Sequence, residues 1–310
     1  MSRYFAGWDG GGTKTTIVCI TPEGDIILRE TAGPLNINGN DTQRARESLS
    51  QALACMASLP GGLDACAGLC IATAGVSNAA QRAFIETELG STLHAPVLIT
   101  GDHQSALFSA FGTNPGIVLI AGTGSICYGQ DAHGNMIRCG GRGHLIDDEG
   151  SGYAIGRDTL SAIVRAEDGR AAPTALCKAV FSALQVSSIE ELIASLYSNR
   201  MDKKDIAALA TLCTTAAQQG DAAAAAILSK AANALYTLVI TVARQLDLPT
   251  VSIALAGGVL TKTNDIRQRL LTQLNQSNIN FSICASAVDA AYGAACMVQS
   301  QFAKDDDTHG

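Results

Sequence analysis

The sequence has little charge and no long uninterrupted run of apolar residues. Charged residues make up 16% of the 310 positions and hydrophobic residues 47%. This balance excludes disorder over the whole length, because disordered chains are rich in charge and poor in apolar side chains. No stretch approaches 18 consecutive apolar residues, so no transmembrane helix is expected. The first seven residues lack the apolar segment of a signal peptide, and we therefore expect a cytoplasmic protein.

Positive charge and paired cysteines are scarce as well. Lys and Arg number 21 against 28 Asp and Glu, a net charge of −7, which argues against a protein that binds nucleic acid by neutralising phosphates. No two pairs of cysteines have the spacing of a zinc site. Most of the ten cysteines lie inside apolar runs, so we expect reduced, buried, small hydrophobic side chains.

The length and apolar content favour two domains. The first begins with three short strands joined by a glycine loop and a tight turn, which is typical of an antiparallel meander. A helix, a fourth strand, a second helix and a fifth strand follow, giving the order βββαβαβ of an α/β protein. The predicted strands are 4–9, 15–20, 26–30, 67–74 and 96–100.

The same meander then starts again at a shift of 110 positions, the difference between Gly122 and Gly12. Identical or similar residues coincide at its joints: Gly12-Thr13 with Gly122-Thr123, Thr15 with Ser125, and Gly24 with Gly134. We interpret this as a duplicated domain in which each half presents a Gly/Thr hairpin loop. The predicted boundary separates residues 1–112 from 113–310, and an Ala- and Leu-rich helical insertion occupies about 150–246 of the second domain.

The most informative motif runs from Asp9 to Thr15, between two strands. A P-loop needs Lys directly after the second glycine and then a helix, but here Thr13 precedes Lys14 and a strand follows. The dinucleotide pattern G-x-G-x-x-G fails because Thr15 takes the third glycine position. The alternatives that remain are an ordinary glycine-rich turn and a phosphate-binding hairpin.

In the phosphate-binding interpretation, Asp9 stands at the entrance of the loop and is the natural ligand of a Mg²⁺ ion. The residues expected to hold phosphate are Gly11, Gly12, Thr13 and Lys14. The second hairpin has Leu119 at the position of Asp9, so one metal site is expected and not two.

Three segments resemble one known family. Residues 9–14 are similar to its first phosphate loop, 121–125 to its second, and 256–259 to its adenosine motif. The family is that of the N-acetylglucosamine kinases, within the superfamily of actin, sugar kinases and heat-shock chaperones. The resemblance implies two ribonuclease-H-like domains around a nucleotide cleft, ATP and Mg²⁺ as cofactors, and a last helix, about 288–302, that crosses back to the first domain. It also implies nucleotide contacts at Gly122, Thr123, Gly124, Gly257 and Gly258.

Asp102 is the candidate catalytic base. It follows strand 96–100, and α/β sheets place their ligands at the carboxyl ends of strands. Phosphoryl transfer uses a carboxylate to take the proton of the attacking hydroxyl. The alternative is an N-cap for a helix over 103–111, a role compatible with catalysis. The resemblance implies that the family's catalytic aspartate lies in this segment.

Two further segments resemble the family's sugar site. Asn36, in 34–37, is expected to bind ring hydroxyls, and the alternative is an ordinary loop asparagine. Segment 140–151 resembles a stretch G-W-G-H-L-L-G-D-E-G-S, and the residues carried over from it are Gly141, Arg142, Gly143 and Asp148. The alternative for this segment is a charged turn before a helix capped near Ser151.

Two departures from that pattern leave the acyl group of the sugar open. Arg142 replaces an aromatic residue found in some members and is suited to a carboxylate or phosphate. Asp147 replaces a glycine and adds negative charge, which suits an amine.

The leading hypothesis is therefore an ATP-dependent hexosamine kinase, acting on N-acetylglucosamine or glucosamine at the 6-hydroxyl by family resemblance. A second hypothesis is an ATPase that activates a partner enzyme through an iron–sulfur cluster, for which Cys127 and Cys139 are candidates. A third is a non-catalytic sugar sensor, but a sensor is expected to lack the base or the metal acid. Neither nucleic acid nor membrane is expected as a partner, and a homodimer is compatible with the resemblance.

Overall fold

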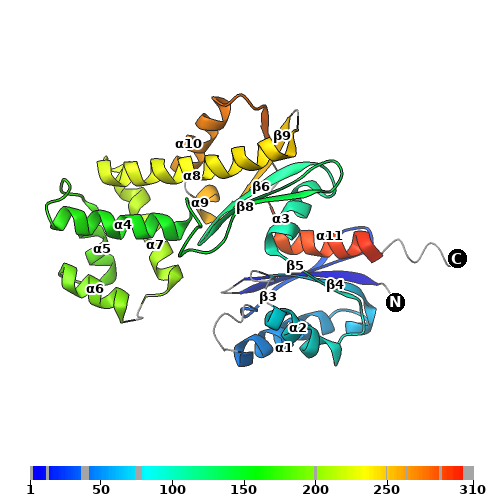
Figure 1. Cartoon of the computed structure of the whole chain (residues 1–310). Coiled ribbons are helices and arrows are strands. Elements are labelled where there is room, and N and C mark those ends of the chain that lie inside the picture. Colours follow the sequence, from blue (N-terminus) through cyan, green and yellow to red (C-terminus); the bar gives the residue numbers. More distant parts are fainter. Residues whose placement is uncertain are drawn as a thin grey trace. The chain divides into compact units, whose positions relative to one another are not determined.

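The computed structural model describes residues 3–11, 14–35, 42–73, 79–198, 201–248, 250–262, 264–285 and 288–302. The chain forms two compact units. The first comprises Met1–Asn114 together with Ser286–Gly310, and the second comprises Pro115–Ala285. The C-terminal helix α11 (Ala290–Phe302) thus belongs to the first unit, next to the start of the chain (Figure 1).

The first unit is built on a five-stranded mixed sheet with the order β3-β2-β1-β4-β5. Strands β1, β2 and β3 form the antiparallel meander, and β4 and β5 run parallel to β1. The strands are β1 (Tyr4–Gly10), β2 (Thr15–Ile20), β3 (Ile26–Ala32), β4 (Cys66–Thr73) and β5 (Val97–Thr100).

Side chains that alternate along β1 pack on opposite faces of this sheet. Tyr4, Ala6 and Trp8 are buried with residues of α1 (Thr42–Ala57) and α2 (Ala79–Gly90). Phe5 is buried on the other face with apolar residues of α11. A third helix, α3 (Asp102–Phe111), packs against α11 on that second face (Figure 1). Asp9 shares the parity of Phe5, so its side chain lies on the α11 face.

The second unit repeats the arrangement with the order β10-β9-β6-β7-β8, again a meander extended by parallel strands. Its strands are β6 (Gly116–Ala121), β7 (Ser125–Gln130), β8 (Met136–Gly140), β9 (Val251–Ala256) and β10 (Phe281–Ile283). β2 and β7 are related by the shift of 110 at both ends, 15 to 125 and 20 to 130. The expected α/β fold with two copies of one sheet is confirmed.

Helices fill the expected insertion and close the second unit. They are α4 (Gly152–Glu167), α5 (Leu176–Leu184), α6 (Ile189–Tyr197), α7 (Lys203–Gln218) and α8 (Ala222–Leu246), followed after β9 by α9 (Gly258–Thr261) and α10 (Asn264–Asn275). Among the described residues α8 has the length and hydropathy of a membrane span, and the bent pair α5 and α6 passes the same test. Leu228, Leu235 and Val239 of α8 are fully buried in the core, which is how the central helix of a globular unit behaves.

Candidate active site

In the first unit, two acidic residues stand where parallel strands end. Asp9 lies near the carboxyl end of β1 and pairs in register with Ala72 of β4, which in turn faces Thr100 at the end of β5. The backbones of Asp9 and Thr100 are thus two strand spacings, roughly 10 Å, apart. Asp102 begins α3 two residues further on. The parallel strands therefore bring the predicted metal acid and the predicted base to one edge of one sheet.

The hairpin after Asp9 is closed by a hydrogen bond from Gly11 N–H to the Lys14 carbonyl, at 3.0 Å. Gly12 and Thr13, which were also predicted to bind phosphate, lie outside the described residues, as does Asn36. Burial and neighbouring carboxylates raise the pKa of Asp9, and the ammonium of Lys14 partly opposes that rise.

Asp9 is in surroundings that favour a bound cation. Burial, first, and then the charges of Asp102 and Asp289 raise the pKa of Asp9 to about 6. A carboxylate that is costly to ionise and faces two further carboxylates gains from a divalent cation. Among the described residues, no group of three or more His, Cys, Asp or Glu side chains is arranged to hold a metal. One carboxylate fits Mg²⁺ nevertheless, because that ion is usually held by one or two carboxylates, substrate phosphates and water.

Asp102 is accessible and is oriented by its neighbour. Its side chain is 44% exposed, and its Oδ1 accepts the His103 backbone N–H at 2.9 Å and lies 3.4 Å from the ring Nδ1. The N-cap of α3 is Gly101, so the alternative role as N-cap was misplaced by one residue. His103, which no sequence motif marks, holds the carboxylate of the predicted base.

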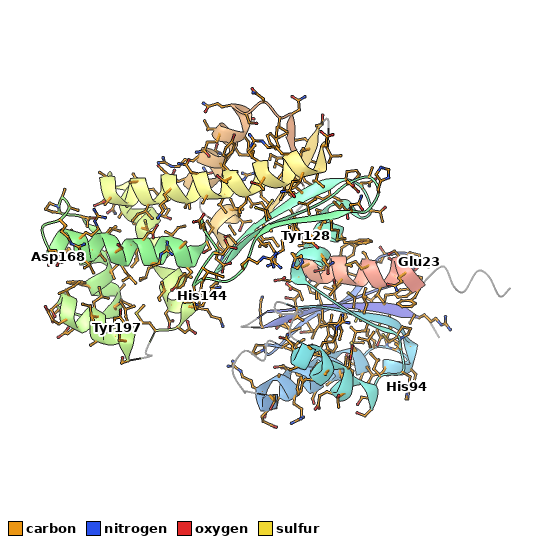
Figure 2. The ribbon with its side chains drawn as sticks, viewed as in Figure 1. Glu23, His94, Tyr128, His144, Asp168 and Tyr197 are labelled. Carbon is orange, nitrogen blue, oxygen red and sulfur yellow. The ribbon has the colours of Figure 1, made fainter. Side chains whose placement is uncertain are left out.

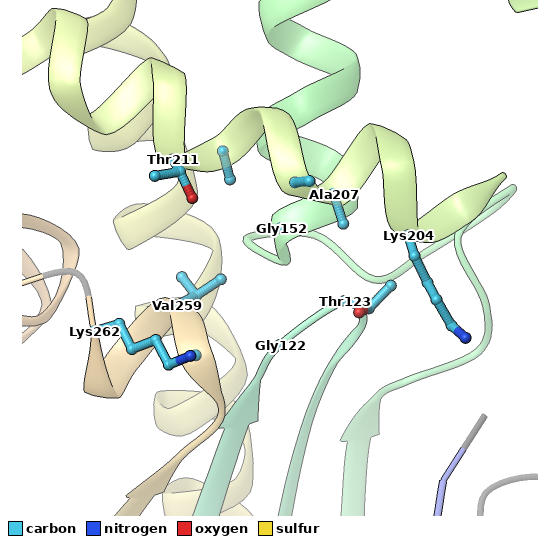
Figure 3. Close-up of a pocket in the computed structure, with 11 residues that line it drawn as sticks. Gly122, Thr123, Gly152, Lys204, Ala207, Thr211, Val259 and Lys262 are labelled. Atoms are coloured by element: carbon cyan, nitrogen blue, oxygen red, sulfur yellow. The ribbon is translucent and has the colours of Figure 1, made fainter. Parts of the chain in front are cut away.

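In the second unit, the hairpin loop and the adenosine motif border one cavity of about 380 Å³ (Figure 3). The predicted residues Gly122, Thr123 and Gly258 line it. Small side chains of α7, including Ala207 and Thr211, form the opposite wall. Because the lining glycine, alanine and threonine side chains are small, a flat nucleoside base has room to lie against the backbone.

Two lysines that the sequence did not single out also line the cavity, Lys204 from α7 and Lys262 after α9. Figure 3 shows Lys204 beside Thr123 and Lys262 beside Val259. Ammonium groups at a nucleotide site are suited to the charge of a phosphate chain. No motif marks these lysines, because α7 and α9 are far apart in sequence and meet only in the folded unit.

The two other predicted nucleotide residues, Gly124 and Gly257, have packing roles beside the cavity. Gly257 has φ +87°, and a Cβ there would come within 2.3 Å of the Ala121 carbonyl oxygen. A Cβ at Gly124 would come within 2.8 Å of an Asp148 carboxylate oxygen. Both glycines thus permit close approach at the ends of β6 and β7.

The predicted sugar segment is a tight, internally bonded loop. Gly141 and Gly143 have φ of +71° and +105°, and Arg142 N–H donates to an Asp147 carboxylate oxygen at 2.8 Å. Asp148 is 4% exposed and accepts the Gly143 N–H at 3.3 Å. Ser151 caps α4, accepting the Ala154 N–H at 3.2 Å, so the predicted helix start coexists with the loop.

Other side chains support this loop from outside. Arg138 donates to the carbonyls of Gly140, at 3.0 Å, and of Gly141. The His144 ring meets the Tyr153 ring edge-on, with centroids 4.7 Å apart. His144 therefore supports the loop through this ring contact.

The cysteines are poorly placed for a cluster. All ten are free thiols and none is exposed. Cys127 is fully buried, and burial, followed by the charge of Cys139, raises its pKa well above the usual value. A thiol held neutral inside a core does not ligate iron at a subunit surface, which weighs against the activator hypothesis.

Two copies of one five-stranded mixed sheet, each with a glycine hairpin at the expected position, define an α/β nucleotide-binding protein of the actin-like ATPase class. The sequence profile of the BadF/BadG/BcrA/BcrD ATPase family matches residues 6–298. The chain belongs to this family.

Three individual proteins are similar to the chain over nearly its whole length. An N-acetylmuramic acid/N-acetylglucosamine kinase of Clostridium acetobutylicum is 32% identical over 303 residues, 96% of this chain and 99% of the relative. An N-acetyl-D-glucosamine kinase of Dictyostelium discoideum is 27% identical, covering 96% and 98%. A crystal structure of a protein of Chromobacterium violaceum, assigned as an N-acetylglucosamine kinase, has a TM-score of 0.79 at 26% identity, covering 96% and 99%. The resemblance to the N-acetylglucosamine kinases is confirmed.

Proposed function

We propose that this protein is an ATP-dependent kinase that phosphorylates an amino sugar, N-acetylglucosamine or glucosamine, at the 6-hydroxyl. The observation that carries the proposal is the cavity bordered by Gly122, Thr123 and Gly258, in a chain whose relatives are named as amino-sugar kinases. The expected class, ATP-dependent sugar kinase, is the class of those relatives. We also propose a cytoplasmic location. For the domains we propose residues 1–112 and 113–310, with the last helix of the second range packing on the first domain.

In this mechanism Asp102 is the general base. His103 N–H occupies Oδ1, so we assign the proton of the sugar hydroxyl to Oδ2. The hydroxyl oxygen forms the new bond to the γ-phosphorus as the bond to the β-phosphate oxygen breaks, and ADP leaves. Asp9 would hold Mg²⁺, which supplies charge neutralisation for the phosphates when bound.

In this proposal the second unit binds and orients ATP and the sugar. Gly122 lines the cavity, and its N–H closes the loop by donating to the Gly124 carbonyl at 2.9 Å. The N–H groups of Thr123 and Gly124 and the ammonium groups of Lys204 and Lys262 hold the phosphate chain, while the α7 wall receives the nucleoside. Gly141, Arg142, Gly143 and Asp148 form the sugar side of the second unit, and Asn36 stays a separate prediction outside the described residues. Arg142 leaves open a sugar that carries a carboxylate, which the relative from C. acetobutylicum accepts according to its name.

The test is ADP release with ATP and Mg²⁺ against a panel of amino sugars, for the parent and for Asp102→Asn. One sugar should stimulate release, and the variant should lose roughly 100-fold or more of that stimulated rate, the loss that a missing general base implies. The matched control is Asp168→Asn at the far end of α4, where a surface carboxylate pairs with Arg170 (Figure 2).

Slow ATP hydrolysis that no sugar stimulates would overturn the proposal. It would favour the alternative ATPase activator, for which iron analysis of the purified protein is the next step.

A further inference from the structure

A partly buried ion pair joins the predicted sugar loop to the helical insertion. The Lys203 ammonium lies 2.9 Å from Asp148 Oδ2, and the two side chains are 33% and 6% exposed. Asp148 has φ +60°, a backbone region that non-glycine residues rarely adopt. Its other oxygen takes the Gly143 N–H. A carboxylate this buried needs a partner for its charge, and Lys203 is that partner.

The neighbour of Lys203 in sequence lines the nucleotide cavity. Lys203 and Lys204 are the first two residues of α7, and consecutive helical side chains project in different directions. Asp202 caps this turn, accepting the N–H groups of Lys204 at 2.6 Å and Asp205 at 3.0 Å. Asp205 returns the bond by accepting the Asp202 N–H at 2.8 Å. The capping bonds therefore hold the backbone of the turn that carries both Lys203 and Lys204.

The backbone of α7 is also fixed to the second hairpin loop. A Cβ at Gly156 of α4 would come within 1.9 Å of the Ile206 carbonyl oxygen, so the two helices touch through backbone atoms. The first residue of α4, Gly152, donates its N–H to the Gly122 carbonyl at 2.8 Å, and Tyr153 donates to Thr123 at 3.3 Å. The loop, α4 and the start of α7 thus form one connected element without side-chain linkers.

We propose that the first turn of α7 couples the two substrates: Lys203 is a positioning residue that holds the sugar-site aspartate Asp148, while Lys204 contacts the nucleotide. Phosphate bound at Lys204 restrains the turn that carries Lys203, and a sugar bound at Asp148 restrains the same turn from the other side. Each substrate then strengthens the binding of the other, and the effect is equal in both directions. This inference rests on the proposed function, since it takes both ligand sites from it.

The experiment measures the Kd of the panel sugar that supports ADP release, by calorimetry, with and without a non-hydrolysable ATP analogue and Mg²⁺. In the parent the analogue should tighten sugar binding by about 5-fold or more, the usual lower range of such coupling. Lys203→Met should weaken sugar binding roughly 10-fold or more, because it leaves Asp148 buried without its cation, and should abolish the coupling. Lys203→Arg should restore most of both.

Lys204→Met gives an independent test that does not disturb the ion pair of Lys203 and Asp148. Sugar binding without nucleotide should stay as in the parent, nucleotide binding should weaken, and the coupling should disappear. This variant decides the matter even if Lys203→Met fails to fold. The matched control is Lys230→Met, which removes a surface lysine paired with Asp158 at 2.7 Å and should keep all parent values.

Several results would overturn the inference. The first is a parent whose sugar affinity is the same with and without the nucleotide analogue. The second is a Lys204→Met variant that keeps the coupling. The third is a Lys203→Met variant that loses sugar and nucleotide affinity by equal factors, as general destabilisation would cause. A parent that releases ADP with no sugar of the panel fails the proposed function instead, so the two failures are distinguishable.

Discussion

At the scale of single residues, Asp9 and Asp102 have different surroundings, and each is therefore suited to a different role. Asp9 is partly buried and its pKa is raised to about 6, whereas the Asp102 side chain is 44% exposed and accepts the His103 N–H. A partly buried carboxylate under the charge of other carboxylates is suited to binding a cation. An exposed, oriented one is a place to accept a proton.

The pKa of Asp9 gives a stability prediction with a definite sign. Since the folded-state pKa is raised from 3.8 to about 6, the stability that Asp9 contributes is present below about pH 4 and is lost as the pH rises through 6. Without metal or nucleotide, Asp9→Asn should therefore be more stable than the parent at pH 8, by about 1 to 3 kcal/mol, and equal to it near pH 4. Urea unfolding at several pH values measures this.

Magnesium provides the counterpart of that prediction. Added Mg²⁺ should stabilise the parent at pH 8 and leave Asp9→Asn unchanged, while Asp168→Asn should respond as the parent does. Equal Mg²⁺ stabilisation of the parent and Asp9→Asn would mean that Asp9 is not the metal acid.

The sequence marked Asp9 because it ends a strand at the entrance of a glycine loop, and Asp102 because it follows a strand. It did not mark His103, Lys203 or Lys204. His103 bonds the adjacent Asp102, Lys203 bonds Asp148 55 residues away, and Lys204 lines a cavity. Such single contacts leave no periodic pattern in the sequence. Asp148 was assigned to the sugar, and its ion pair with Lys203 emerged only from the packing of α7.

At the scale of elements, the hairpin loops could be predicted more closely than the helical insertion. β2 and β7 begin and end at the predicted shift because turn glycines and β-branched runs act locally. The insertion was predicted as helical, but helical periodicity does not say which helix lines a cavity. Gly7, upstream of the first hairpin, has a packing role that its sequence context does not mark, because a Cβ there would come within 2.2 Å of α11 backbone atoms.

Gly257 provides a test of the junction between β6, β9 and α9. Gly257→Ala places a Cβ within 2.3 Å of the Ala121 carbonyl at φ +87°, so the start of α9 must shift away from β6. We expect a loss of roughly 1 to 3 kcal/mol of stability and a KM for ATP raised more than the KM for sugar.

The matched control is Gly220→Ala, where φ is +91° but no atom lies within 4 Å of the added Cβ. It should cost only the backbone strain, roughly 1 kcal/mol, and keep the parent KM for ATP. Thermal unfolding and steady-state kinetics separate the two, and equal effects would contradict this role of Gly257.

At the scale of the whole molecule, the chain leaves its first unit after Asn114 and returns to it at Ser286. The returning helix α11 covers one face of the first sheet through small residues, among them Ala291, Ala294 and Ala295, which are buried there with Phe5 and Val18. The sequence predicted this helix, and its return to the first domain was implied only by the family topology. An apolar helix at a chain end does not by itself say which sheet it covers.

Gly7→Ala tests that division. Its Cβ would meet Ala291 O and Ala295 N at 2.2 Å, so α11 must move off β1. We expect roughly 1 to 3 kcal/mol of destabilisation, with faster amide hydrogen exchange in β1, β4 and α11 and unchanged exchange in β6 to β10. Gly90→Ala, where no atom lies within 4 Å, is the control. Faster exchange spread evenly over both sheets would contradict two separately packed units.

The central claim is that this protein transfers phosphate to an amino sugar with Asp102 as the base, and product analysis by ³¹P NMR tests it most directly. The parent, given ATP, Mg²⁺ and N-acetylglucosamine or glucosamine, should produce a sugar 6-phosphate and ADP in equal amounts. Asp102→Asn should produce neither at a comparable rate, while Asp168→Asn should match the parent. Release of ADP with inorganic phosphate alone, or a sugar phosphate formed equally fast by Asp102→Asn, would contradict the account.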